Sequence, residues 1–263
     1  MTSSAFNALR SRLRYRIERR YALVDTSFTF GSLTLPFTRV ANPDRVLDEV
    51  AAEEDRLERV SGVRAPSEQL HLPYWAELWD SAIGMGQWLA RNRDERGGMR
   101  DGQDVRLSPI HPSSLRPHPW SSVLDLGCGM GLAGTVAAAL GAQVLFADLE
   151  PPALLFARLN SLPWRERVRT RRLDWRTDQL ANRFDLILGA DILYERKQWD
   201  YLEPFWRAHV VPQGTVLLGE PGRQTGDLFV EWIAQRGWRL TRHAEKVETR
   251  QQPIRLFELH LWT

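Results

Sequence analysis

From residue 121 onward, the chain alternates between short apolar runs and longer segments in which apolar residues recur every three or four positions. Short apolar runs are typical of buried parallel strands, and the longer amphipathic segments are typical of helices that cover a sheet. Five runs are predicted to be parallel strands: 123–126, 144–147, 168–173, 184–188 and 214–219. Two later runs, 238–247 and 254–262, alternate between apolar and polar residues and predict an antiparallel pair. The pattern predicts an α/β fold with a seven-strand, Rossmann-like sheet and helices on both faces.

The N-terminal part of the chain has a different pattern. Residues 5–20 combine arginines with apolar residues at four-residue spacing, which predicts an amphipathic helix. The alternating region that follows predicts a β-hairpin, and a helix is predicted to start near Pro43. We expect residues 1–65 to form a helix, hairpin and helix cap on a domain that spans residues 66–263. Within that domain, residues 92–120 are rich in Pro, Gly, Arg and Ser and are predicted to form a long loop.

Composition limits the function only slightly. The chain has 263 residues, of which 43% are hydrophobic and 26% are charged, and its formal net charge is +2. This charge is too small to indicate nucleic-acid binding, and we expect the arginines of the N-terminal helix to be solvated. No apolar run approaches the length of a membrane span, so no membrane contact is predicted. Cys128 is the only cysteine, which excludes an intrachain disulfide and favours a cytoplasmic location.

The segment 121–150 carries the clearest chemical signal. A predicted strand runs into Gly127, Gly129 and Gly131, an alanine-rich helix follows, and the next strand ends on Asp148. Glycines permit a tight turn and let a ligand approach the main chain, while a helix N-terminus favours negative groups. An acid at the end of the second strand is placed to accept hydrogen bonds from two ribose hydroxyls. The segment therefore predicts a site for an adenosine-containing cofactor.

Two alternatives remain open at this loop. Residues 129–134 also fit the G-x-G-x-x-G pattern of dinucleotide sites, so the loop alone does not distinguish NAD from another adenosine cofactor. A glycine-rich turn can also serve packing alone. Five parallel strands that end in an antiparallel pair differ from the six parallel strands of the dinucleotide fold, which favours a cofactor other than NAD.

Six short elements of the sequence resemble one known family. They are PYWAELW at 73–79, VLDLGCGMG at 123–131, ADLE at 147–150, LDW at 173–175, GADILY at 189–194 and GEPGR at 219–223. Over about residues 70–263 the chain resembles the class I, seven-strand S-adenosylmethionine-dependent methyltransferases. It is similar in particular to the branch with the methyltransferase-like 21 lysine methyltransferases and the electron transfer flavoprotein β-subunit lysine methyltransferase. The resemblance implies the seven-strand methyltransferase sheet, S-adenosylmethionine as cofactor and S-adenosylhomocysteine as product.

The resemblance also implies which residues bind the cofactor. They are Trp79, Asp125, Gly127, Gly129, Gly131, Asp148, Asp174 and Trp175. The three glycines would cradle the methionine part, with Asp125 near its amino group. Asp148 would hold the ribose. Trp175 would flank the adenine beside Asp174, and Trp79 would lie near the sulfonium.

Asp191 and Tyr194 are implied to border the acceptor nitrogen. We expect Asp191 to position an amine whose proton leaves to water. A base role for Asp191 is the second possibility, and a cap on the following helix is the structural alternative.

The resemblance predicts an enzyme that methylates a lysine side chain of a protein partner and uses no metal. A small amine of the nicotinamide type is the alternative acceptor. An NAD-binding oxidoreductase and a non-catalytic cofactor-binding module are weaker alternatives. RNA is a disfavoured acceptor because the chain lacks an N-P-P-Y motif.

Overall fold

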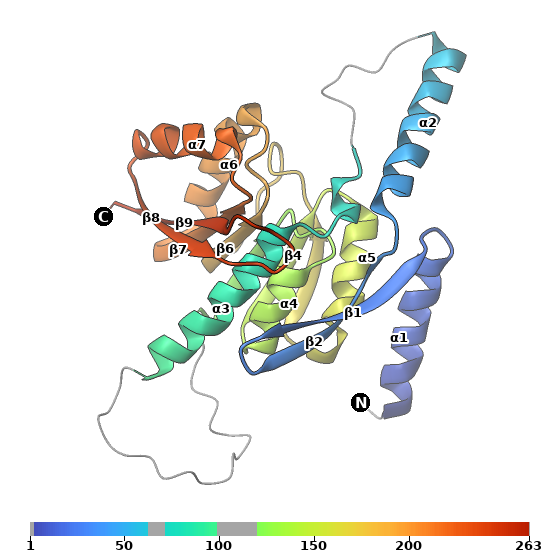
Figure 1. Ribbon diagram of the computed structural model, residues 1–263, viewed down its shortest axis with the longest axis horizontal. Coiled ribbons are helices and arrows are strands. Elements are labelled where there is room, and N and C mark those ends of the chain that lie inside the picture. The colour runs from blue at the N-terminus through green and yellow to red at the C-terminus, as the bar shows by residue number, and fades with distance from the viewer. Residues whose placement is uncertain (1–2, 63–71, 99–119, 263) are drawn as a thin grey trace.

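The computed structural model describes residues 3–62, 72–98 and 120–262 (Figure 1). Its main sheet has seven strands in the order β5-β4-β3-β6-β7-β9-β8. The strands are β3 (Ser122–Leu126), β4 (Gln143–Asp148), β5 (Val168–Arg172), β6 (Phe184–Ala190), β7 (Val210–Glu220), β8 (Trp238–Glu245) and β9 (Ile254–Leu261). Neighbouring strands are parallel from β5 to β7, and β9 is antiparallel to both β7 and β8. The predicted α/β fold class and its closing antiparallel pair are confirmed.

The order of the strands places the ligand-binding edge of the sheet. The chain continues from β3 to β4 and β5 on one side, and then crosses to β6 and β7 on the other side. In open α/β sheets, ligands bind at the carboxyl ends of the strands, next to the point where the strand order reverses. That point lies between β3 and β6, so the glycine-rich loop after β3 borders the expected crevice.

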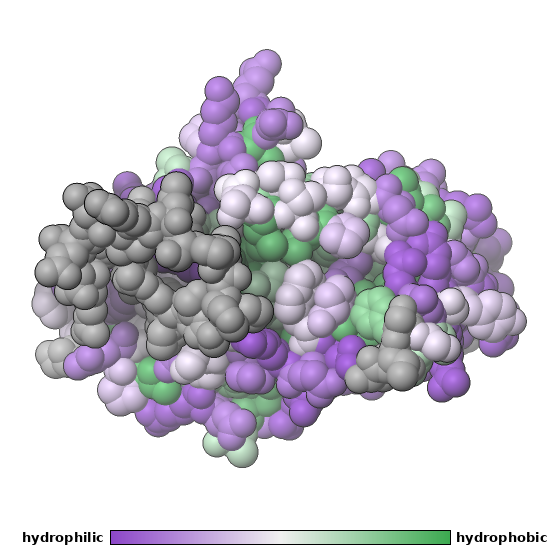
Figure 2. Space-filling view, turned by 90° about the horizontal axis from the view of Figure 1, so that it is seen from below, coloured by the Kyte–Doolittle hydropathy of each residue, from purple (hydrophilic) through white to green (hydrophobic). Residues whose placement is uncertain are grey.

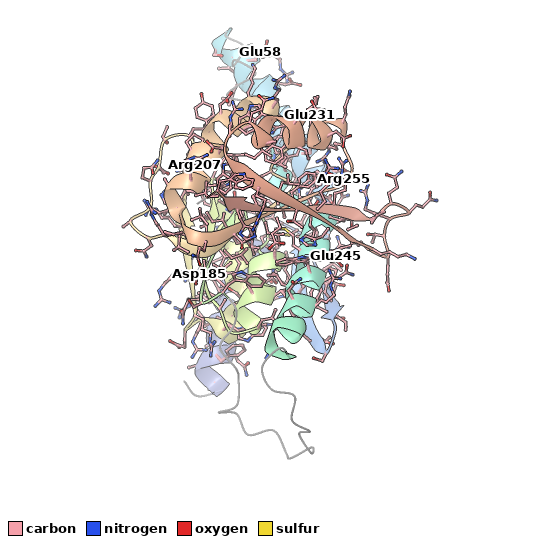
Figure 3. All side chains as sticks on the ribbon, turned by 90° about the vertical axis from the view of Figure 1, so that its left-hand side faces the viewer. Glu58, Asp185, Arg207, Glu231, Glu245 and Arg255 are labelled. Atoms are coloured by element: carbon pink, nitrogen blue, oxygen red, sulfur yellow. The ribbon has the colours of Figure 1, made fainter. Side chains whose placement is uncertain are left out.

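Helices cover both faces of the sheet. On one face lie α3 (Asp80–Gly98), α4 (Leu132–Ala139) and α5 (Pro151–Asn160), and on the other lie α6 (Arg196–His209) and α7 (Gln224–Ala234). In Figure 3, Arg207 of α6 and Glu245 at the end of β8 lie on opposite sides of the sheet. Glu245 forms an ion pair with Arg91 of α3, which ties that helix to the edge of the sheet.

The N-terminal segment packs its first helix and its hairpin on the outer side of the α3–α5 layer, whereas its second helix extends beyond that layer (Figure 1). It consists of α1 (Ser3–Glu18), β1 (Leu23–Phe30), β2 (Leu33–Val40) and α2 (Pro43–Ser61), with β1 and β2 paired in an antiparallel hairpin. The Phe30 ring lies so close to Gly86 of α3 that a Cβ there would be 2.6 Å from it. The Asn160 side chain of α5 accepts a hydrogen bond from the Thr38 nitrogen at 2.8 Å and donates one to the Thr38 oxygen at 3.0 Å. The inner side of this segment therefore shares the apolar core of the main sheet.

Two boundaries differ from the sequence-based expectation. α3 continues to Gly98, so the loop predicted from residue 92 does not begin there, and residues 99–119 lie outside the described part of the chain. Residues 91–96 include three arginines and one glutamate, which have good helix propensity and favour the extension past residue 92. β7 begins at Val210, four residues before the predicted start at 214. Its first residues include Gln213, whose φ is 64°. This irregular backbone interrupts the strand pattern, so the sequence did not indicate the earlier start.

Large apolar side chains are concentrated inside the molecule rather than on its surface. Trp88 of α3 and the two α6 tryptophans, Trp199 and Trp206, are each at most 1% exposed. Figure 2 shows the face seen from below Figure 1, where hydrophobic residues form small patches between hydrophilic ones. None of the helices in the described ranges has both the length and the apolar character that a membrane crossing requires.

Candidate active site

A cavity of about 670 Å³ lies at the carboxyl ends of β4, β5 and β6. The glycine-rich loop after β3, the short helix η2 (Tyr74–Ala76) and the start of α6 complete its wall. Eight of the ten residues predicted for the site line this cavity: Trp79, Gly127, Gly129, Asp148, Asp174, Trp175, Asp191 and Tyr194. The crevice expected at this edge of the sheet is therefore present and open.

Asp148, the last residue of β4, presents its carboxylate to the cavity. The residue is 8% exposed. Its Oδ2 accepts a hydrogen bond from the Gly129 nitrogen at 2.8 Å, and its Oδ1 accepts one from the Glu150 nitrogen at 2.9 Å. Each carboxylate oxygen has two lone pairs, so each retains one for a ligand hydroxyl. Burial raises the pKa of Asp148 to about 6, which leaves most of the group ionised at pH 7.

The backbone of the glycine loop is left-handed at Gly127 and Gly129, whose φ values are 64° and 52°. Residues with a Cβ rarely adopt such angles. A Cβ at Gly127 would lie 2.9 Å from Cγ2 of Ile192, whereas a Cβ at Gly129 would meet the Trp75 carbonyl oxygen only at 3.5 Å. Gly129 is therefore open toward the cavity, where a ligand can approach its main chain.

Gly131 and Asp125 do not line the cavity. Gly131 begins α4 with a φ of 82°, and a Cβ there would lie 2.8 Å from the Cβ of Ala157 on α5. Asp125 is 1% exposed, and its Oδ2 accepts a hydrogen bond from the Gly134 nitrogen at 2.9 Å. Burial raises the pKa of Asp125 to about 7. Both residues pack behind the loop, and their cofactor contacts stay predictions.

Asp174 and Trp175 follow β5, and the Trp175 indole lies beside the glycine loop, 3.5 Å from where a Cβ at Gly127 would be. The Asp174 carboxylate pairs with the Arg176 guanidinium, with N–O distances from 2.7 to 3.2 Å. Trp175 Nε1 donates a hydrogen bond to Oε1 of Gln198 at 3.0 Å. Gln198 belongs to α6 and also lines the cavity, so this bond fixes the indole against the start of that helix. The arrangement offers an aromatic face for a planar ring.

Aromatic side chains form the outer wall of the cavity. Tyr74 contacts both Tyr194 and Trp79 edge to face, with ring centroids 5.5 and 6.3 Å apart. Trp79 Nε1 donates to the Tyr74 carbonyl oxygen at 3.0 Å. Tyr194 is 41% exposed, and partial burial raises the pKa of its phenol. Tyr74 is 42% exposed and lines the cavity.

Asp191 lies at the end of β6 in a left-handed conformation with a φ of 58°. Its nitrogen donates to the Gly219 oxygen at 2.8 Å, which anchors the turn to β7. Its carboxylate is in an ion pair with the Arg223 guanidinium. Burial raises the pKa of Asp191, and Arg223 opposes that shift. The structural alternative, in which Asp191 caps the next helix, is wrong because α6 begins at Arg196 with Glu195 in the N-cap position.

Sequence reasoning recognised the GEPGR element but not the contacts that it makes. The Glu220 carboxylate accepts hydrogen bonds from the nitrogens of Gly222 and Arg223 at 3.0 and 2.9 Å, and it also pairs with Arg255. The loop is thereby folded so that Arg223 reaches back to Asp191. No local spacing in the sequence predicts these ion pairs, because the partners lie on or next to three different strands. The one available signal was the presence of two charged residues, Glu220 and Arg223, in a short turn.

The strand order and the cavity define a nucleotide-binding α/β protein of the seven-strand type, with an acid and bare glycine backbone on one wall and a second acid among aromatic rings on the other. A model of the lysine methyltransferase family matches residues 69–234, more than half of the chain, and the protein belongs to that family.

Two curated relatives and one solved structure illustrate the similarity. Protein N-lysine methyltransferase METTL21A of Xenopus tropicalis is 41% identical over 105 residues, which is 37% of this chain and 47% of the relative. The electron transfer flavoprotein β-subunit lysine methyltransferase of Xenopus laevis is 31% identical over 158 residues, 57% of this chain and 53% of the relative. The glycopeptide N-methyltransferase MtfA complexed with sinefungin is 15% identical with a TM-score of 0.49, and the match covers 56% of this chain and 89% of MtfA. The chain spans about half the length of the curated relatives it matches.

Proposed function

We propose that the protein transfers the methyl group of S-adenosylmethionine to a lysine side chain of another protein. Membership of the lysine methyltransferase family supports this reaction. The observation that carries it is the cavity itself, in which Asp148 and Gly129 lie on one wall and Asp191 and Tyr194 on another. A cofactor and an acceptor can therefore meet in one space at the carboxyl edge of the sheet.

The residues of the cavity fit the cofactor. Its volume of about 670 Å³ lies within the range of roughly 300–1,000 Å³ that is common for small-molecule sites. Asp148 has a free lone pair on each oxygen for the two ribose hydroxyls, Trp175 offers a ring face for the adenine, and Gly129 leaves its main chain accessible. Trp79 and the tyrosines beside it offer π faces, which attract a cation such as a sulfonium.

S-adenosylmethionine, when bound, supplies a methyl group on a positively charged sulfur, which leaves as a neutral thioether. The protein therefore has little acid catalysis to provide, and orientation of the amine can contribute about 7–11 kcal/mol. Asp191 can accept a hydrogen bond from the acceptor nitrogen, and the rings of Tyr74 and Tyr194 shield its approach from water. Lysine has a pKa near 10.4 in water, so a neutral amine at pH 7 costs about 4–5 kcal/mol unless the site lowers that pKa.

Transfer of labelled methyl groups tests the proposal. The purified protein is incubated with radiolabelled S-adenosylmethionine and a cell lysate, and Asp148→Ala serves as the control. A discrete labelled protein band that disappears with the control variant supports protein methylation. Label found only in small metabolites supports the small-amine alternative. The β-subunit of electron transfer flavoprotein, the substrate in the name of one relative, is the first purified acceptor to add.

A thermal-shift panel separates the cofactor classes. Stabilisation by S-adenosylhomocysteine but not by NAD supports the proposal, and stabilisation by NAD alone contradicts it. A protein that binds S-adenosylhomocysteine but labels neither proteins nor metabolites would be the non-catalytic binding module. A cytoplasmic location is part of the proposal, and fractionation of cells that express the protein tests it.

A further inference from the structure

Arg223 stands directly behind the acceptor side of the cavity. Asp191 and Trp79 line the cavity. Arg223 is not among the described residues that line it. The guanidinium pairs with both oxygens of Asp191, and its Cζ lies 5.6 Å from the centroid of the Trp79 indole. The Asp191 side chain is only 3% exposed. A group that enters the cavity can therefore contact Asp191, while the Arg223 guanidinium lies on the side of Asp191 that faces away from the cavity.

Contacts to other parts of the fold fix the main chain of Arg223. Glu220, whose side chain is 3% exposed, binds the Arg223 nitrogen and the Arg255 guanidinium at once. Arg255 in turn donates to the Arg223 carbonyl oxygen at 2.7 Å. The main chain of Arg223 is thus held from both ends by buried or partly buried groups.

A buried carboxylate without a positive partner would slow methyl transfer to a lysine beside it. Its negative charge stabilises the ammonium form of a lysine and so raises the pKa of that lysine. Methyl transfer needs the nitrogen lone pair to form the new C–N bond as the C–S bond breaks and its electron pair stays on sulfur. An ammonium has no free lone pair. A fixed positive charge behind the carboxylate offsets its negative charge, so the pKa of the lysine is raised less. The same ion pair holds the carboxylate in position to accept a hydrogen bond from the lysine.

We propose that Arg223 is a positioning residue, which holds the Asp191 carboxylate against the cavity and offsets its charge so that the acceptor amine can lose its proton to water before transfer. This inference rests on the proposed function, because it concerns the acceptor of that reaction. Arg223 acts through Asp191 and does not itself touch the acceptor.

Among the described residues, two further charged groups, Glu220 and Arg250, act on Asp191. Glu220 acts on it from the end of β7 and is paired with Arg255, and Arg250 acts on it from the β8–β9 connection. Tyr194 lies in the turn after β6, and partial burial raises the pKa of its phenol, which favours the neutral form. Arg223 is the charge in direct contact with Asp191, so its removal dominates the change in electrostatics.

The test compares pH profiles of methyl transfer for the intact protein, Arg223→Gln and Arg223→Lys. The acceptor is the protein labelled in the lysate experiment, used in purified form, and kcat at saturating acceptor is measured from pH 7 to 11. At an effective dielectric of about 20, a unit charge roughly 7 Å away shifts an amine pKa by about one to two units. Arg223→Gln should therefore have a kcat about 10- to 100-fold lower at pH 7, and this deficit should shrink as the pH rises past the pKa of the bound amine, which is near 10.4 for an unshifted lysine.

Two controls separate electrostatics from folding. Arg223→Lys keeps the charge and should keep the pH profile close to that of the intact protein. Arg207→Gln removes an arginine from another partly buried ion pair, with Glu203, on the α6 side of the sheet (Figure 3). It should leave the profile unchanged. Thermal stabilisation by S-adenosylhomocysteine shows that each variant is folded and still binds the cofactor product.

A deficit of Arg223→Gln that is the same at every pH overturns the inference, because a merely structural loss scales all rates equally. So does a profile for Arg223→Lys that matches Arg223→Gln. If the intact protein itself labels no protein, the proposed function has failed, and that outcome is visible before any Arg223 variant is measured.

Discussion

The two walls of the cavity are held by different kinds of contact. On the glycine side, which we define as Gly127, Gly129 and Asp148, the acid binds main-chain nitrogens 19 and 2 residues away, within one strand–helix–strand unit. On the aspartate side, which we define as Asp191 and Tyr194 with Arg223 behind them, the acid binds a guanidinium from the loop after β7, 32 residues away, and the ring contacts come from η2. Local geometry fixes the first wall, whereas tertiary contacts assemble the second. A change on the glycine side should therefore affect cofactor binding, and a change on the aspartate side should affect transfer.

Asp148→Ala should have the largest effect. It removes the charged acceptor for both ribose hydroxyls and releases the nitrogens of Gly129 and Glu150. Hydrogen bonds to a charged group contribute about 1.5–3 kcal/mol each, so affinity for S-adenosylhomocysteine should fall by about 10²–10⁴-fold. Isothermal titration calorimetry measures it. An affinity within threefold of the intact protein would show that Asp148 is not the ribose acceptor.

Asp191→Asn should separate the two walls. Asparagine tolerates the left-handed backbone at this position and has nearly the same shape, so the fold and the glycine side should be preserved. Loss of one charge-assisted hydrogen bond to the acceptor amine predicts roughly a 10- to 100-fold lower kcat/KM, with an unchanged S-adenosylhomocysteine affinity. Asp191→Ala should lose more transfer. Normal turnover by either variant would mean that Asp191 does not border the acceptor.

Gly131→Ala tests whether the glycine side also depends on packing. The added Cβ would lie 2.8 Å from the Cβ of Ala157 and 2.9 Å from its Cα, in addition to the strain of a φ of 82°. Gly62 at the end of α2 is the matched control, since its φ is 67° and no atom of the described residues lies within 4 Å of the added Cβ.

Both alanine variants incur the conformational cost, and only Gly131→Ala adds overpacking, which typically costs about 1–3 kcal/mol. Urea denaturation should therefore show a free energy of unfolding roughly 1–3 kcal/mol lower for Gly131→Ala than for Gly62→Ala. Equal losses would place α4 and α5 farther apart than the structure does.

The same difference between the walls explains what could be predicted from the sequence. The strand–glycine–helix–strand spacing around Gly129 and Asp148 is local, so both the strands and the cavity position were predicted correctly. The ion pair between Asp191 and Arg223 depends on how β6 and β7 lie side by side and on how Glu220 folds the turn between them. Hydrophobic periodicity contains no information on such a contact. Asp125 shows the converse limit, because a motif position can be matched while its side chain points away from the cavity.

A change of pH should affect stability and cofactor binding in opposite directions. Burial raises the pKa of Asp148 to about 6 and that of Asp125 to about 7, well above the value near 3.9 of an unfolded chain. A carboxylate with a raised pKa binds its proton more tightly in the folded state. The free energy of unfolding should therefore increase by roughly 2–4 kcal/mol as the pH falls from 8 to 5.

Cofactor affinity should change the other way, because only an ionised Asp148 accepts both ribose hydroxyls. The ionised fraction falls about tenfold between pH 7 and 5 for a pKa of about 6, so the Kd for S-adenosylhomocysteine should rise by about tenfold. Calorimetry and urea denaturation over the same pH range measure both effects. Asp125→Asn serves as the control: it should flatten part of the stability change and leave the affinity change intact, because Asp125 does not line the cavity. If affinity and stability fall together as the pH is lowered, the ribose is not held by the ionised carboxylate of Asp148.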